Sequence, residues 1–283
     1  MEQRNGGILI TGGTGFLGRA IVRELLANPA GEHRICIYSR NEHSQAAMFE
    51  DFGRHPRLRM FIGDVRDRER LYWAMRSVSH VIHAAALKRI EVGHYNPTEM
   101  VRTNIEGAMN VVAAAIAADV HRAVLVSTDK AYHPVSPYGI SKAMAEAVFQ
   151  ASNNTVATGG PTFGVCRYGN VAGSTGSVIP VWRAALAAGR PVQMRDPTCT
   201  RFWMTATEAV EVVLATLHGT EQLRIPQLKA FLLADLAHAM DADVELTSLA
   251  RWEKKHESLQ DGQSSDTAPR MTVDELREAL KHV

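Results

Sequence analysis

Ile8-Leu-Ile-Thr-Gly-Gly-Thr-Gly-Phe-Leu-Gly18 is the stretch that decides the fold of this 283-residue chain. Its opening run, Ile8 to Thr11, is apolar without alternation, which predicts a strand covered by helices on both faces. Gly12, Gly15 and Gly18 then follow as TGxxGxxG. Glycines at this spacing allow a tight turn, close approach of the backbone to a pyrophosphate, and close packing of a helix on a sheet. The stretch predicts a dinucleotide-binding turn; the alternative is an ordinary glycine-rich turn between a strand and a helix.

The same alternation of strand and helix continues downstream. Apolar runs at 35–38, 57–62, 78–84 and 123–127 predict strands, and segments ending near residue 28 and spanning 68–76, 100–118 and 136–152 predict helices. This rhythm is typical of a Rossmann-like, doubly wound parallel sheet of the α/β class. Beyond residue 160 the pattern becomes irregular. We therefore expect residues 1–160 to form the dinucleotide-binding domain and residues 161–283 to form mainly a smaller substrate-binding lobe, with some segments returning to the first domain.

Composition excludes several classes of protein. Apolar residues make up 46% and charged residues 22% of the chain, as in globular proteins. The formal net charge of +1 gives no electrostatic argument for a nucleic-acid or membrane partner. No run approaches the ~20 apolar residues that a membrane span needs. An anionic ligand must therefore be bound by local groups.

The cysteines and the first residues bear on the compartment. Cys36, Cys166 and Cys199 are odd in number and show no CxxC spacing, which is more typical of a reducing compartment than of a disulfide framework. The polar run from Met1 to Gly7 lacks the pattern of a signal peptide. We expect a cytoplasmic protein.

Arg40 favours NADP over NAD. It follows the second predicted strand, where an NAD enzyme usually presents a carboxylate to the ribose 2′-hydroxyl. A guanidinium there can pair with a 2′-phosphate, although Glu42 keeps NAD possible and Arg40 can also be a plain surface charge. The residues that we predict to contact the cofactor are Gly12, Thr14, Gly15, Phe16, Leu17, Gly18, Ser39, Arg40, Asp64, Val65, Ala84, Ala85, Ala86, Lys88, Asn104, Tyr138 and Lys142.

Tyr138 and Lys142 are four residues apart, so they share one face of the predicted helix 136–152. A cationic lysine near a phenol lowers the phenol pKa from about 10 and makes the phenolate a usable base. Ser136 fits the N-cap of this helix and Pro137 its first position. Such pairs also arise by chance on solvated helices, but the glycine turn upstream favours a catalytic pair.

Longer motifs resemble a known family. The stretch from Ser127 to Lys142, STDKAYHPVSPYGISK, is similar to the signature of inverting UDP-N-acetylglucosamine 4,6-dehydratases, a group within the extended short-chain dehydrogenase/reductase family. HAAALK, YNP, TNIEGAMNV, RYGNVAGSTGSVIP and TRFWMT, found between His83 and Thr205, resemble the same group. These motifs are more specific than the glycines alone, and the similarity covers almost the whole chain.

The resemblance implies a 4,6-dehydration that serves polysaccharide biosynthesis. Tyr138 takes the C4 hydroxyl proton while hydride passes to NADP⁺, Lys130 in its neutral form removes the C5 proton, and protonated Asp129 donates to the departing 6-hydroxyl. Hydride returns to C6, and reprotonation from the opposite face inverts C5. We expect burial and the charge of Lys142 to keep Lys130 neutral, and Thr128 to bond the substrate or Tyr138. An exposed ion pair is the alternative interpretation of Asp129 and Lys130.

By the same resemblance, Lys88, Asn170 and Arg201 contact the sugar or its diphosphate. Arg201 is the best electrostatic candidate because a guanidinium can bind phosphate through two hydrogen bonds, whereas Asn170 can also brace a turn. The segment from Glu253 to Glu257 resembles a degraded GEKxHE motif, in which Trp252 stands where the family has glycine. That departure affects recognition of the nucleotide base.

Three functional interpretations remain open on the sequence. The leading one is a nucleotide-sugar 4,6-dehydratase acting on UDP-N-acetylglucosamine, followed by a nucleotide-sugar 4-epimerase and by a non-catalytic NADP-binding regulatory or scaffold protein. The histidines show no metal-ligand spacing, so we expect no catalytic metal. The alanine-rich helices 100–118 and 136–152 predict a homodimer or a larger homo-oligomer.

Overall fold

The computed structural model describes residues 6–28, 31 and 33–283, so the polar start over residues 1–5 lies outside the described residues. The main sheet, in the described part of the chain, consists of β1 (Gly7–Thr11), β2 (Ile35–Ser39), β3 (Leu58–Ile62), β4 (Val78–His83), β5 (Arg122–Val126), β6 (Thr162–Cys166) and β10 (Leu223–Arg224). All pairs are parallel, and their order is β10-β6-β5-β4-β1-β2-β3. The predicted Rossmann-like fold is confirmed. Chain order reverses between β1 and β4, beside which such sheets bind ligands.

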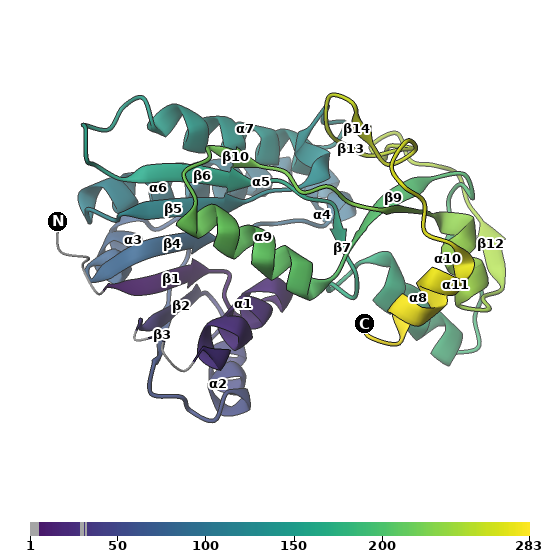
Figure 1. Cartoon of the computed structure of the whole chain (residues 1–283), viewed down its shortest axis with the longest axis horizontal. Coiled ribbons are helices and arrows are strands. Elements are labelled where there is room, and N and C mark those ends of the chain that lie inside the picture. Colours follow the sequence, from purple (N-terminus) through teal and green to yellow (C-terminus); the bar gives the residue numbers. More distant parts are fainter. Residues whose placement is uncertain (1–5, 29–30, 32) are drawn as a thin grey trace.

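Helices cover both faces of this sheet (Figure 1). One face carries α1 (Phe16–Ala27), α2 (Glu42–Asp51) and α9 (Ala206–His218), and the other carries α3 (Arg68–Met75), α6 (Gly107–Ala117) and α7 (Pro137–Ser152). Within β1, Ile8 and Ile10 belong to the core under the first set of helices, while Leu9 belongs to the core under the second. Both faces of β1 are therefore apolar, which explains why its sequence does not alternate.

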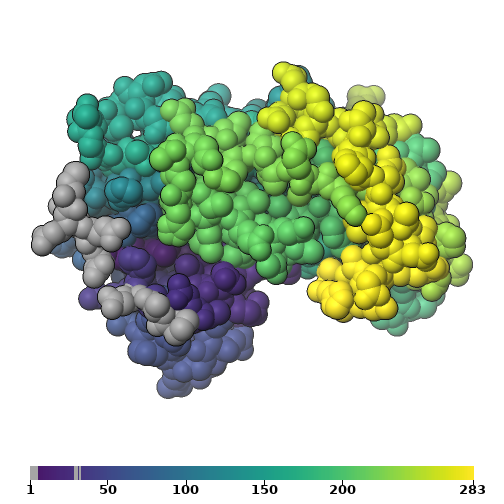
Figure 2. All heavy atoms as spheres, in the orientation of Figure 1, coloured from purple at the N-terminus to yellow at the C-terminus, as the bar shows by residue number. Residues whose placement is uncertain are grey.

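A smaller lobe packs beside the carboxyl ends of the sheet. Its strands are β7 (Asn170–Val171), β8 (Val192–Met194), β9 (Thr200–Met204), β11 (Ala230–Leu232), β12 (Val244–Leu246), β13 (Ser258–Gln260) and β14 (Gln263–Ser264), and its helices are α8 (Val178–Ala187), α10 (Leu233–Ala239) and α11 (Val273–Leu280). Trp182, Trp203 and Phe231 contribute to its own apolar core. Figure 2 shows the C-terminal segment, in yellow, running over the outer surface of this lobe.

Three segments from beyond residue 160 belong to the main sheet or cover it, namely β6, α9 and β10. Helix α9 packs against β4, β5 and β6, and β10 pairs with β6 through Leu223 and Arg224. Arg122 ties this return together, because its guanidinium donates to the carbonyls of Thr216 at 2.9 Å and Glu221 at 2.7 Å. The sheet is thus built from both halves of the chain.

The helix predicted over 100–118 is present to Ala117, but its first part is a π-helix and shorter helices precede it. The structure has α4 (Ile90–Tyr95), α5 (Pro97–Met100) and a π-helix, η1 (Val101–Glu106), before α6 begins. Asn104 lies in η1, where its amide donates to the Leu87 carbonyl at 2.9 Å and its oxygen accepts from the Leu87 N–H at 2.8 Å. These bonds hold the helix to the loop after β4. Among the described residues, no helix has both the length and the apolar character required to cross a bilayer.

Candidate active site

A cleft of about 880 Å³ lies where the carboxyl ends of the main strands face the smaller lobe. It brings together the predicted site residues, with one exception discussed below. The lining residues predicted from the sequence are Gly12, Thr14, Gly15, Phe16, Leu17, Gly18, Ser39, Arg40, Asp64, Val65, Ala84, Ala85, Ala86, Lys88, Thr128, Asp129, Lys130, Tyr138, Lys142, Asn170 and Arg201. Because these residues come from the ends of successive strands and from both lobes, the cleft depends on the whole fold.

The glycine turn forms a cradle that has no room for a side chain at Gly12 or Gly18. Gly12 has φ +68°, and a Cβ there would lie 2.8 Å from the amide nitrogen of Ala85. A Cβ at Gly18 would overlap the backbone of Gly13. Within the described residues, Gly15 caps α1 without any hydrogen bond from a side chain. The N–H groups of the first turn therefore point toward a site suited to an anion such as a pyrophosphate.

The part of the cleft lined by Ser39, Arg40 and Asp64 is polar. Arg66 holds the carboxylate of Asp64 through its backbone N–H at 2.9 Å and its Nη2 at 2.7 Å. Burial opposes ionisation of Asp64, but the bonds from Arg66 lower its pKa overall, with Arg40 adding to that effect. Gln45 fixes Ser39 by donating to its hydroxyl at 3.0 Å. This part can bind a ribose through Asp64 and Ser39, and Arg40 offers a cation beside it.

A short 3-10 turn, η2 (Asp129–Ala131), carries the acid and base candidates after β5. Thr128 caps it by accepting from the Lys130 N–H at 3.3 Å, and the Thr128 hydroxyl donates to Asp129 Oδ1 at 3.0 Å. Lys130 Nζ donates to the same Oδ1 at 3.0 Å. Asp129 is fully buried. The Lys130 side chain is 21% exposed and lines the cleft, so the interpretation of a fully exposed ion pair is wrong.

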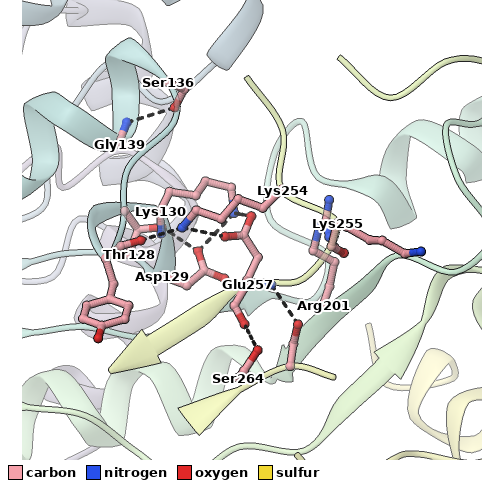
Figure 3. Close-up of polar contacts among 12 residues, drawn as sticks. Thr128, Asp129, Lys130, Ser136, Gly139, Arg201, Lys254, Lys255, Glu257 and Ser264 are labelled. Atoms are coloured by element: carbon pink, nitrogen blue, oxygen red, sulfur yellow. Dashed lines mark hydrogen bonds and ion pairs between the residues drawn. The ribbon is translucent and has the colours of Figure 1, made fainter. Parts of the chain in front are cut away.

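The predicted helix cap is confirmed and places Tyr138. The Ser136 hydroxyl accepts from the Gly139 N–H at 3.1 Å, and Pro137 occupies the first turn of α7. Figure 3 shows this cap beside η2. Tyr138 and Lys142 then both face the cleft from one side of α7.

Lys142 does not act on the Tyr138 phenol as expected. Its Nζ donates to the Val126 carbonyl at 2.8 Å, and burial lowers the Lys142 pKa to about 8. Burial also raises the pKa of Tyr138 to about 12, against the lowering effects of the Lys130 ammonium and the Thr128 hydroxyl. The cation that favours the phenolate in this structure is therefore Lys130.

Glu257 is the functional candidate that sequence reasoning missed. Its side chain is 3% exposed, and its Oε1 lies 3.3 Å from Lys130 Nζ. Its Oε2 lies 3.4 Å from Lys254 Nζ. Figure 3 shows these side chains meeting at Glu257, with Arg201 nearby. The degraded GEKxHE motif contained this residue, but the motif alone gave no reason to place it against Lys130.

The expectation of a neutral Lys130 is wrong. Burial alone would lower its pKa, but the carboxylates of Asp129 and Glu257 outweigh burial and raise it above its ordinary value. For Asp129, burial and the charge of Glu257 raise the pKa against the effects of Lys130 and Thr128. For Glu257, burial is outweighed by Lys130, Arg201 and Lys254, which lower the pKa. Glu257 is the more acidic of the two carboxyl groups.

The three predicted substrate contacts, Lys88, Asn170 and Arg201, all line the cleft. Arg201 Nη1 donates to the carbonyls of Thr200 at 2.7 Å and Lys255 at 3.0 Å, which anchors it in the cleft wall. Burial lowers the pKa of Lys88. Among the predicted cofactor contacts, Asn104 is the one that does not line the cleft: it is buried and donates to the Ser141 hydroxyl at 2.9 Å. Its place is structural support for the cleft wall.

Several buried polar atoms of the cleft have no hydrogen-bond partner among the residues that the structure covers. They are Asp129 Oδ2, Asn170 Oδ1, Ser177 Oγ, Trp252 Nε1 and Glu257 Oε2. An unpaired buried polar group costs about 1–3 kcal/mol. Donors and acceptors in one cleft are suited to a polyhydroxylated, polar ligand.

Trp252, which stands where the family has glycine, also lines the cleft. Its ring packs edge-on to His94, with ring centroids 3.9 Å apart. Arg195 joins the same two segments, with its guanidinium 3.3 Å from Glu253 and 3.9 Å from Glu91. Helix α4 of the first domain is thus linked to the lobe across the cleft. Over residues 6–28, 31 and 33–283, no cluster of His, Cys, Asp and Glu is arranged to hold a metal ion.

Comparisons with known sequences identify a family and several relatives. The profile described as "Polysaccharide biosynthesis protein" matches residues 8–273. A UDP-N-acetylglucosamine 4,6-dehydratase (inverting) of Campylobacter jejuni subsp. jejuni serotype O:2 is 42% identical over 258 residues, which cover 89% of this chain and 76% of the relative. A UDP-glucose 4-epimerase of Rickettsia massiliae is 35% identical over 262 residues, covering 89% and 76%.

Solved structures are similar over nearly the whole chain. The X-ray structure of Pen from Bacillus thuringiensis has a TM-score of 0.94 and 28% identity, covering 100% of this chain and 99% of Pen. DesIV of Streptomyces venezuelae, a dTDP-glucose 4,6-dehydratase solved with NAD, has a TM-score of 0.81 and 24% identity, covering 97% and 95%. The likeness to DesIV concerns the fold alone.

Proposed function

The chain belongs to the polysaccharide biosynthesis protein family, and on that premise we propose that it is a nucleotide-sugar 4,6-dehydratase that converts UDP-N-acetylglucosamine to a 4-keto-6-deoxy sugar. The observation that carries this proposal is the pair of buried Asp129 and partly buried Lys130, joined at 3.0 Å and lining the same cleft as Tyr138. Oxidation at C4 alone needs the phenol, whereas loss of water across C5 and C6 also needs a base and an acid.

The glycine cradle, Asp64 and Ser39 fit a nicotinamide dinucleotide. When bound, that cofactor supplies reversible hydride transfer. Tyr138 accepts the proton of the C4 hydroxyl as the alcohol becomes a ketone, and the Lys130 ammonium favours the phenolate that does so. The 4-ketone then makes the C5 proton acidic. Lys142 donates to the carbonyl of Val126, a residue that lines the cleft.

In the elimination, Lys130 accepts one proton and Asp129 donates one. The C5–H bond breaks, its proton goes to neutral Lys130, and its electron pair forms the C5=C6 double bond. The C6–O bond breaks, and the leaving oxygen takes a proton from Asp129 and departs as water. The step leaves Asp129 as a carboxylate and Lys130 as an ammonium, which is the ion pair seen in the structure. Because the resting enzyme holds this ion pair, a proton must move from Lys130 Nζ to Asp129 Oδ1 before the elimination, which gives the neutral base and the protonated acid. After the elimination C6 receives the hydride, and C5 takes a proton from solvent water while Tyr138 returns its own proton to solvent. We propose inversion at C5, as for the Campylobacter jejuni relative.

We propose NADP as the preferred cofactor and NAD as the alternative. Arg40 lines the cleft beside Ser39 and favours a 2′-phosphate. DesIV, in contrast, was solved with NAD. Measuring the dissociation constants of both cofactors on protein stripped of bound nucleotide decides the question, and equal or tighter binding of NAD contradicts the assignment.

Further parts of the proposal concern assembly, location and domains. We propose a homodimer formed through α6 and α7, supported by exposed Met109, Ile140 and Met144 on these neighbouring helices. We propose a cytoplasmic location, supported by three buried free cysteines. Residues 1–160 would bind the cofactor, and residues 161–283 would mainly bind the substrate.

The experiment that tests the function is incubation with a panel of nucleotide sugars, followed by mass spectrometry. We expect UDP-N-acetylglucosamine to lose one water and, in deuterium oxide, to gain deuterium at C5. Lys130→Ala should lower the rate at least ~10²-fold, because it removes the base. Leu246→Ala, exposed on β12 and outside the cleft lining, is the control and should retain the parental rate.

Two alternative functions give other results. A 4-epimerase, as the Rickettsia relative is named, would change the configuration at C4 without loss of mass and without deuterium at C5. A binding protein would hold NADP and turn over none of the sugars. Dehydration by Lys130→Ala at the parental rate contradicts the proposed mechanism.

A further inference from the structure

Glu257 is buried against the proton-transfer pair but comes from the other lobe. It precedes β13, whereas Asp129 and Lys130 lie in η2 after β5. Its backbone N–H donates to the Ser265 hydroxyl at 2.9 Å, and its carbonyl accepts from the Ser264 hydroxyl at 3.3 Å. Ser265 is fully buried and also bonds the Thr200 hydroxyl at 2.7 Å. The carboxylate is therefore held in place by a fixed polar scaffold.

The charges around Glu257 come from each element that packs on it. η2 contributes Asp129 and Lys130, β9 contributes Arg201, and the segment preceding β13 contributes Lys254. Tyr138 of α7 is the next titratable group, since both Lys130 and Asp129 act on it. Figure 3 shows Lys130 and Lys254 approaching the Glu257 carboxyl group, and each lysine contacts a different oxygen of it.

One lysine needs one balancing charge, but two carboxyl groups face Lys130. Their oxygens lie 3.0 Å (Asp129) and 3.3 Å (Glu257) from its Nζ. Glu257 has a second cation at 3.4 Å, namely Lys254, and Arg201 nearby, whereas Asp129 is fully buried and has Lys130 alone as a paired cation among the ion pairs of the described residues. The negative charge is therefore more stable on Glu257, and the proton is more stable on Asp129.

We propose that Glu257 is the third member of the proton-transfer unit: its buried carboxylate sets the pH range in which Asp129 and Lys130 exchange protons with the substrate. This inference rests on the proposed dehydratase function. Glu257 is a positioning residue, since it acts through Lys130 and Asp129 and takes no proton from the sugar. Three groups this close titrate as one unit.

The test is the pH profile of kcat for Glu257→Gln. A nearby negative charge raises the pKa of a lysine and of a carboxyl group alike, so its removal lowers both. We expect both limbs of the profile to move to lower pH, by about one pH unit or more. A purely structural role would lower kcat at every pH and leave the limbs in place.

Two control variants are compared with Glu257→Gln. Glu257→Asp retains the charge on a shorter side chain, so the profile should stay at the parental pH even if kcat falls. Glu275→Gln removes an exposed carboxylate that pairs with Lys229 at 2.8 Å, far from the cleft, and should change neither kcat nor the limbs. A Glu257→Gln enzyme that is active with its limbs at the parental pH overturns the inference.

A second measurement covers the case in which Glu257→Gln does not fold. The Lys130 ammonium of the parental protein can be titrated by NMR with ¹³C-labelled lysine, assigned by loss of its signal in Lys130→Arg. We expect it to stay protonated above the range of an ordinary lysine, and titration at or below about 10.4 contradicts the inference. The proposed function fails separately, by absence of sugar dehydration in the parental protein.

Discussion

Lys142 occupies a position in which its charged form is disfavoured. It is 3% exposed, donates to the Val126 carbonyl, and has its pKa lowered by burial to about 8. The unfolded chain keeps an ordinary lysine that releases its proton near 10.4. Between these two pH values the unfolded state binds more protons than the folded state, so stability rises with pH.

Lys142→Met should therefore be more stable than the parental protein at pH 7, by about 1–3 kcal/mol. The difference should close above about pH 11, where the parental lysine is mostly neutral in both states. Urea unfolding at the two pH values measures this. Lys229→Met, at a half-exposed position paired with Glu275, is the control and should show little change. A Lys142→Met protein that is less stable by the same amount at both pH values contradicts the explanation.

For individual residues, the sequence identified most of the cleft lining but did not predict which carboxylates surround Lys130. Gly12, Asp129, Lys130 and Tyr138 follow strand ends in known order, so local pattern alone brought them into one cleft. Glu257 comes to Lys130 only through the packing of the lobe on η2. The protonation state of Lys130 was predicted wrongly for the same reason, because a pKa depends on spatial neighbours that sequence periodicity does not reveal.

Helix α7 is the element that sets the distance between the phenol and the acid-base turn. Its cap at Ser136 and its first residues pack directly on η2. A Cβ at Gly139 would overlap the Lys130 carbonyl oxygen and lie 3.1 Å from the Pro134 Cβ. The close approach of α7 to η2 depends on the absence of a side chain there.

Gly139→Ala should therefore push η2 away from α7. We expect a loss of about 1–3 kcal/mol in unfolding free energy from overpacking, and a fall of ~10²-fold in kcat because displacement by about 1 Å misaligns the reacting groups. Thermal unfolding and sugar dehydration measure the two effects. Ala147→Ser, at an exposed position of the same helix, should change stability by about 0.5 kcal/mol or less. A Gly139→Ala enzyme with parental kcat contradicts this account.

Elements were predicted well wherever their signal is local. Strand runs and the Ser136 cap depend on neighbouring residues, and the structure confirms them. The π-helix η1 was not foreseen, because its shape is tied to bonds between Asn104 and Leu87 and between Asn104 and Ser141. Those partners lie in other segments, so no local period reports them.

On the scale of the whole molecule, α6 and α7 present apolar side chains to solvent. Met109 is 52%, Ile140 55% and Met144 51% exposed, although the two helices pack together on the sheet. A two-fold axis would let this surface bury itself against its own copy.

Met144→Glu should convert the proposed dimer to a monomer, because a carboxylate is costly to bury without a partner. Size-exclusion chromatography with light scattering measures the mass. Leu246→Glu, exposed on β12 of the smaller lobe, is the control and should leave the mass unchanged. A parental protein that is monomeric at micromolar concentration, or a Met144→Glu protein that remains dimeric, contradicts the assembly.

The late return of β10 to the main sheet bears on how the protein is made. When β6 has left the ribosome, its outer edge is unpaired, because its partner strand β10 at 223–224 has not yet been translated. Helix α9, which covers β4, β5 and β6, also arrives afterwards. The nascent chain is thus exposed to premature pairing over this interval, and a pause in translation between α8 and β10 would lengthen the period in which aggregation competes with folding.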